Sequence, residues 1–176
     1  DDEGRSVSSA VHSIPNGGVF QVGAAELFEF PRDQFVGWIR VSSATAKLIG
    51  SVTFASTDGS KLAALPLQES GARESVLGHV AQTDDIYTGI TVLNPQAHSA
   101  LLSIEVFSAD GQLTGRRLTS LKGNSKQALL LNEWIPGIDD QVGGFIRIRS
   151  TRPLMAFELF GSDAYLAAVP QQVLVP

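Results

Sequence analysis

The stretch GWIRVSS, residues 37–43, returns almost unchanged within GGFIRIRS, residues 143–150. Around it, Glu26–Ser43 and Glu133–Ser150 share seven of eighteen residues at an offset of 107 positions. Further on, KLAALPLQ (61–68) matches YLAAVPQQ (165–172) at five of eight positions, at an offset of 104. Two matches in the same order indicate an internal duplication. We place the three-residue difference in the turn STDGS (56–60), because loops tolerate changes in length.

The two copies differ in extent. At the first offset, DDEG (1–4) lies opposite SADG (108–111), so nothing in the first copy corresponds to Leu77–Phe107. We therefore predict a partial repeat at residues 1–70, here copy one, and a complete repeat at residues 71–176, copy two. The segment Glu69–Gly78 is interpreted as a short linker that keeps the copies packed together.

A repeat without its opening strands leaves a sheet edge and an apolar face uncovered. Three arrangements resolve this. Copy two covers the gap within the same chain; or a neighbouring chain adds a strand, using the arm DDEGRSVSSAVHS (1–13) or the tail VLVP (173–176); or the missing strands belong to a longer parent protein. We favour the first. The second would make the protein a fibre subunit that associates through its exposed sheet edge.

Apolar alternation and turn residues predict an all-β fold, an antiparallel β-sandwich of two related repeats. Ile39, Val41, Ile146 and Ile148 should be buried, because they share one face of their strands. Arg40 and Arg147 fall on the other face, beside an aromatic ring, with their head groups partly in solvent. For copy two we expect short strands at 77–81, 86–93, 100–107, 113–119, 126–131, 144–150, 154–160 and 164–169, with a helical turn at 132–137 and its equivalent at 25–30.

Composition excludes several classes of protein. The chain is 43% hydrophobic, which suffices for a core, and its net charge of −5 argues against nucleic acid as a partner. The absence of cysteine excludes disulfides, zinc ribbons and thiol nucleophiles. No apolar run approaches the ~20 residues of a membrane span. The opening DDEGRSVSS is not a signal peptide, so we expect one to have been removed or to lie upstream.

The search for catalytic motifs yields no candidate residue. His12, His79 and His98 stand apart from one another, and no serine lies in a GxSxG motif. The acid pairs Asp84–Asp85 and Asp139–Asp140 match no known calcium loop, so we interpret them as solvated loop residues rather than metal ligands. We expect no catalytic, cofactor or metal site.

Several motifs of copy two resemble a family of β-sandwich repeats: TGITVLNP (88–95), FSADG (107–111), GGFIRIRS (143–150), FELFG (157–161) and LAAVP (166–170). Those repeats occur in exported bacterial proteins, often in tandem. The resemblance implies an extracellular or cell-envelope location and carries no catalytic signature. Copy one departs from the pattern at VTFAST (52–57), where FELFG stands in copy two.

Two classes of function follow. The first is a non-enzymatic structural or interaction module whose partner is a neighbouring domain or subunit. The second is a module that binds glycans or another ligand, with Trp38, Tyr87 or Trp134 as stacking surfaces.

Overall fold

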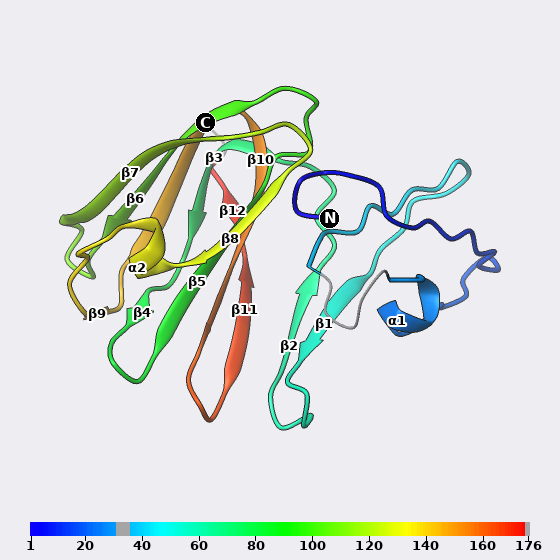
Figure 1. Cartoon of the computed structure of the whole chain (residues 1–176), viewed down its shortest axis with the longest axis horizontal. Coiled ribbons are helices and arrows are strands. Elements are labelled where there is room, and N and C mark those ends of the chain that lie inside the picture. Colours follow the sequence, from blue (N-terminus) through cyan, green and yellow to red (C-terminus); the bar gives the residue numbers. More distant parts are fainter. Residues whose placement is uncertain (31–35, 175–176) are drawn as a thin grey trace.

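The computed structural model describes residues 1–30 and 36–174, and its regular structure is almost entirely antiparallel β (Figure 1). The all-β prediction is confirmed, whereas the sandwich and the duplication stay interpretations. The elements are α1 (Ala24–Leu27), β1 (Ser51–Ala55), β2 (Leu62–Pro66), β3 (Ala72–Leu77), β4 (Ala81–Gln82), β5 (Tyr87–Leu93), β6 (Ala100–Phe107), β7 (Leu113–Leu121), β8 (Lys126–Leu130), α2 (Leu131–Trp134), β9 (Gln141–Val142), β10 (Phe145–Gly161), β11 (Leu166–Pro170) and β12 (Gln172–Val173).

The long strand β10 organises copy two. Its first half pairs with β3 and β6, and its second half pairs with β5 and β11. The sequence predicted two strands here, 144–150 and 154–160; they form one strand whose register with β3 shifts between Arg149 and Leu154. Pro153 lies in this interval and has no N–H to donate to a ladder. Each half of β10 therefore belongs to a different set of strands.

These two sets share one core. The first set runs β7-β6-β10-β3-β12, and the second runs β8-β5-β10-β11. Alternate residues of both sets meet in a single cluster, in which each fully buried aliphatic side chain contributes roughly 1.5–3 kcal/mol. The predicted burial of Ile146 and Ile148 is confirmed. Other members of the cluster are Leu77, Ile90, Val92, Ile104, Val106, Leu131, Trp134 and Leu154.

Copy one differs from the prediction in residues 37–43, the segment that matches residues 144–150 of copy two. Residues 37–43 form no strand, and Ile39 and Val41 are 52% and 53% exposed, so their predicted burial is wrong. The reason lies in the neighbours of the equivalent segment. In copy two this part of β10 lies between β3 and β6, which supply both its hydrogen bonds and its cover. In the described part of the chain, no strand pairs with residues 37–43.

The predicted linker, residues 69–78, also differs. Most of it is strand β3, which pairs with β10 on one side and β12 on the other. Ser75 and Leu77 are buried, so this segment is part of the core sheet and the linker prediction is wrong. Asp33 and Gln34, which the offset of 107 places opposite Asp140 and Gln141, lie outside the described part of the chain.

The segment before β1 has little regular structure. Between residues 1 and 50 the described part contains one element, the short helix α1, near the predicted helical turn. Many of its apolar side chains are exposed. They are Val7, Val11, Ile14, Val19, Phe20, Val36, Ile39, Val41, Leu48 and Ile49. No helix within residues 1–30 and 36–174 is long and apolar enough to span a membrane.

Candidate functional site

The hairpin β1–β2 repeats the register of the hairpin formed by β10 and β11. In copy one Ser51 pairs with Pro66, the proline of LAALP; in copy two Phe157 pairs with Pro170, the proline of LAAVP. Six residues (56–61) connect the first pair of strands and four (162–165) connect the second. The turn of copy one is therefore longer by two residues, so the prediction that placed all three residues of the difference there is wrong for one of them, which precedes β1.

The hairpin of copy one packs against the hairpin of copy two, and β2 runs beside β11 (Figure 1). Phe54 stacks on Phe157 with 5.9 Å between ring centroids, and Ala63 and Leu65 are buried. Phe54, Ala63 and Leu65 lie on the same face of their hairpin, because Phe54 pairs directly with Ala63. Copy two thus covers one apolar face of copy one.

Polar contacts also join the hairpin of copy one to copy two. Lys61 Nζ donates to the carbonyl of Ser162 (3.3 Å), and Gln68 Nε2 donates to that of Ala156 (3.0 Å).

The start of the chain is held by Lys126, whose Nζ pairs with Asp2 (3.1 Å) and donates to the Gly37 carbonyl (2.7 Å). In addition, the Lys126 amide donates to the Asp2 carbonyl (2.8 Å). The first residues of the arm considered above for strand donation are therefore held by their own chain. The tail is engaged as well, because Gln172–Val173 pairs with β3.

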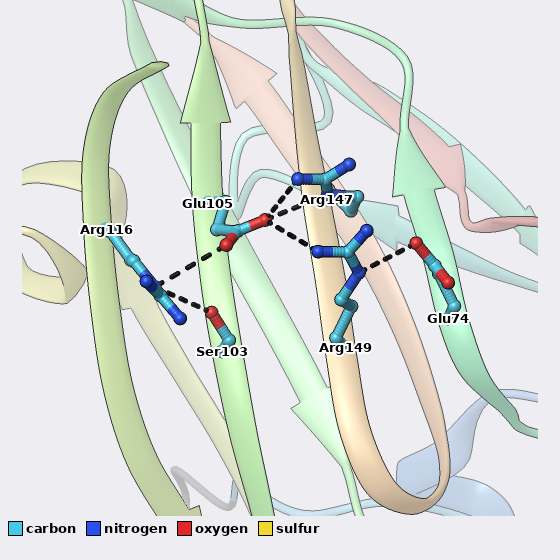
Figure 2. Close-up of polar contacts among 6 residues, drawn as sticks. All are labelled: Glu74, Ser103, Glu105, Arg116, Arg147 and Arg149. Carbon is cyan, nitrogen blue, oxygen red and sulfur yellow. Dashed lines mark hydrogen bonds and ion pairs between the residues drawn. The ribbon is translucent and has the colours of Figure 1, made fainter.

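A cluster of charged side chains crosses four strands of copy two (Figure 2). Glu105 on β6 accepts two hydrogen bonds from Arg147 on β10, at 2.8 and 2.7 Å. Arg116 on β7 and Arg149 on β10 approach the same carboxylate at 3.5 and 3.7 Å. Arg149 also pairs with Glu74 on β3 at 2.9 Å. The cluster joins β7, β6, β10 and β3 across one face.

The electrostatics of this cluster favour a structural role. Glu105 is 6% exposed, and burial alone raises the pKa of its carboxyl. The hydrogen bonds and charge of Arg147, with the charges of Arg149 and Arg116, outweigh that effect and hold the pKa below its usual value. Arg147 also lies over the Phe107 ring, 4.8 Å from its centroid. In copy one, Arg40 lies over Trp38 at 5.2 Å and is exposed, as predicted.

An acidic cleft of about 650 Å³ opens where β4, β5, α2 and the β10–β11 turn meet. It brings together both predicted acid loops, through Asp84, Asp85 and Asp140, and adds Asp163 from the turn. Sequence reasoning missed Asp163, because only the fold brings residue 163 near residue 84. Within residues 1–30 and 36–174 no three acidic or histidine side chains are placed to hold a metal ion. Tyr87 and Asn132 also line this cleft.

The predicted stacking residues do not form one surface. Trp134 is wholly buried and donates Nε1 to the Ile90 carbonyl (3.0 Å), so it cannot stack on a ligand. Trp38 is half-buried and donates to the Asn124 carbonyl (3.2 Å), whereas Tyr87 lines the cleft. Two of the histidines contact phenylalanine rings, His12 against Phe20 and His79 against Phe160.

Glu158 is a buried acid in the second half of β10. Its side chain is fully enclosed, next to Ile90 of β5 and Val169 of β11 in the ladder. Burial raises the pKa of this carboxyl to about 8, and the backbone N–H of His79 offsets only part of the effect. Neither oxygen accepts a well-formed hydrogen bond from the described residues. Glu158 is therefore largely protonated at neutral pH.

Comparison with known proteins adds information on the fold alone. No family model matches the chain, and no curated protein matches it. The crystal structure of Thermotoga maritima 1070 is similar, with a TM-score of 0.51 and 14% sequence identity. The similarity covers 59% of this chain and 96% of that chain. At this level of identity it indicates a shared fold and nothing about activity.

Proposed function

We propose that the chain is a non-enzymatic structural or interaction module of a bacterial extracellular or cell-envelope protein. In this proposal two related β-sandwich repeats, one of them partial, pack on one another, and the partner is a protein. The proposal rests chiefly on the packed hairpins, in which Phe54 of copy one stacks on Phe157 of copy two. Such a contact fits repeats arranged in tandem, where each unit covers a face of the next.

Two further observations support equivalent copies. The hairpins share their register relative to the prolines of LAALP and LAAVP. Gly4 and Gly111, which the offset of 107 aligns, both have a φ of 81° in turns closed by a bond to the residue three positions earlier. The extracellular location rests on the family resemblance of the motifs in copy two.

Hydrogen–deuterium exchange on Phe157→Ala tests the proposal. In the wild-type chain the amides of residues 50–67 that bond across the hairpin should exchange slowly, because packing on β11 holds the hairpin closed. Phe157→Ala should speed their exchange while the core amides of β6 stay protected. Leu101→Ala serves as the control, since Leu101 is 64% exposed on β6. If the wild-type hairpin exchanges as fast as an unstructured peptide, the proposal is wrong.

The acidic cleft favours a second candidate, a module that binds a glycan. Tyr87 lines the cleft beside Asn132 and the acidic side chains, and an aromatic ring among polar groups suits a sugar. A glycan array probed with the wild-type chain and with Tyr87→Ala separates the two candidates. Binding that is lost in Tyr87→Ala favours the glycan module, whereas an array without binding favours the structural one.

A further inference from the structure

Strand β1 has one edge that no other strand occupies in the described part of the chain. Ser56 N–H donates to the Lys61 carbonyl (3.0 Å), and Leu67 N–H donates to the Gly50 carbonyl (2.9 Å). Backbone groups along an antiparallel strand alternate in direction, so residues 50, 52, 54 and 56 face β2. The N–H and C=O groups of Ser51, Thr53 and Ala55 therefore point away from the hairpin. All three residues are exposed.

The equivalent edge in copy two is filled. Ser162 N–H donates to the Tyr165 carbonyl (3.0 Å), and Gln171 N–H donates to the Ala156 carbonyl (3.2 Å). The same alternation directs the backbone groups of Phe157, Leu159 and Gly161 toward β5. There they oppose Thr91, Gly89 and Tyr87. By the shared register, Phe157, Leu159 and Gly161 correspond to Ser51, Thr53 and Ala55. Copy two thus shows which kind of strand fits this edge, in which direction and in which register.

The side chains of β1 suit an uncharged strand. Its sequence SVTFA carries no charge and no proline, the devices that usually protect an exposed edge from pairing. Val52, which is 36% exposed, stands where β10 has Glu158, and Glu158 lies next to Ile90 of β5. An apolar residue in the place of Ile90 would cover Val52. The strand β5 itself, YTGITVL, is uncharged throughout.

We propose that the free edge of β1 binds, antiparallel, an extended uncharged strand with the pattern of β5, supplied by another repeat of this kind. The strand places its Gly89-type residue opposite Thr53 and its Ile90-type residue beside Val52. This inference rests on the proposed function, because it treats the two hairpins as equivalents. It adds the acceptor strand, the backbone groups that bond, and the chemistry of the segment that occupies the edge.

The test uses a fluorescent peptide with the sequence of residues 86–94, IYTGITVLN, and the whole chain, with binding followed by fluorescence anisotropy. N-methylation at Gly89 removes an N–H that faces the acceptor and should weaken binding roughly tenfold. N-methylation at Ile90 should leave binding within about threefold, because Asn94 N–H donates to Ser125 and places the even-numbered N–H groups of β5 on the β8 side. Thr53→Pro in the protein should weaken binding to a similar extent, and Thr53→Ala should not.

Each outcome decides the proposal. Binding that the Gly89 modification weakens and the Ile90 modification spares supports it. Absence of binding, or equal loss from both modifications, overturns it, and these peptides need no protein variant in case Thr53→Pro fails to fold. Dimers of the wild-type chain that light scattering detects, that Thr53→Pro abolishes and that excess peptide fails to dissociate would show that the edge pairs with a segment other than a β5-type strand and would overturn the proposed occupant. Slow exchange in the hairpin together with absent peptide binding would reject this inference while leaving the proposed function intact.

Discussion

Ile146 is wholly buried between β3 and β6, whereas Ile39, its counterpart 107 positions earlier, is 52% exposed. Nearly the same seven residues thus form a central strand in copy two and an irregular segment in copy one. The difference lies in the neighbours, because a strand needs partners for its backbone groups and cover for its apolar face. Within the described residues, this segment of copy one therefore lacks the neighbouring strands that its counterpart in copy two has.

Glu158 should make stability depend on pH. The pKa of its carboxyl is raised in the folded state to about 8 from an ordinary value of 4.5, so the folded protein binds the proton more tightly than the unfolded chain. The contribution to stability is complete below pH 4.5 and is lost as the pH rises to about 8. Glu158→Gln keeps a neutral side chain and should flatten the melting temperature across this range. Melting curves from pH 5 to pH 8.5, with Glu133→Gln as an exposed control, measure the effect.

Glu105 should be the most sensitive member of the charged cluster. Glu105→Gln leaves the Arg147 guanidinium without its carboxylate in a half-buried place, at a cost of about 2–4 kcal/mol. Arg116→Ala removes a contact of 3.5 Å from a side chain that is 53% exposed, and should cost less than about 1 kcal/mol. Urea unfolding of the two variants gives both values. Equal losses would show that the Arg116 contact accounts for the whole contribution of Glu105 and would contradict the central place of Arg147.

Lys126 should fix the start of the chain. Its ammonium group contacts Asp2 and the Gly37 carbonyl, and its side chain is only 14% exposed. Lys126→Met removes both contacts, so thermolysin should cleave residues 1–50 faster while leaving copy two intact. Lys122→Met, at an exposed lysine four residues earlier, should not change the cleavage rate. Faster cleavage in both variants would trace the effect to the loop rather than to the contacts of Lys126.

Stability should be independent of divalent metal. The cleft collects Asp84, Asp85, Asp140 and Asp163, yet the described residues offer no set of three ligands at metal-binding positions. The melting temperature should be the same in chelator and in calcium. A fall of many degrees in chelator would contradict this prediction and assign calcium to the cleft, which Asp140→Asn would then confirm by removing the dependence.

The sequence predicted the elements of copy two better than those of copy one, for a physical reason. In copy two the alternation that predicts burial of Ile146 and Ile148 matches the structure, where both side chains belong to the core cluster. In copy one the same alternation at Ile39 and Val41 favours a strand. Alternation in one segment does not show, however, whether other strands lie beside that segment to pair with it. Contacts between distant residues, such as Phe54 with Phe157, depend on how the hairpins pack and leave no local signal in the sequence.

The buried acids were missed for a similar reason. Glu158 stands in FELFG at a position that alternation assigns to the core, where an acid is unexpected. Glu105 also lies within an apolar strand, and its partner Arg147 is 42 residues away. Composition and spacing indicate neither the burial of Glu158 nor the pairing of Glu105 with Arg147. The acid loops at residues 84–85 and 139–140 were visible as motifs, whereas their meeting in one cleft follows from the fold alone.

Residue-resolved amide exchange along β1, followed by NMR, tests most directly whether one edge of this strand is open to pairing with another strand. We predict alternation: the amides of Val52 and Phe54, which face β2, exchange slowly, and those of Thr53 and Ala55, which face the free edge, exchange fast. In β10 the amides of residues 157–161 should all be slow, because both edges are paired. Uniformly slow exchange along β1 would show that its edge is already covered, and uniformly fast exchange would show that the hairpin does not form; either result contradicts an open acceptor strand.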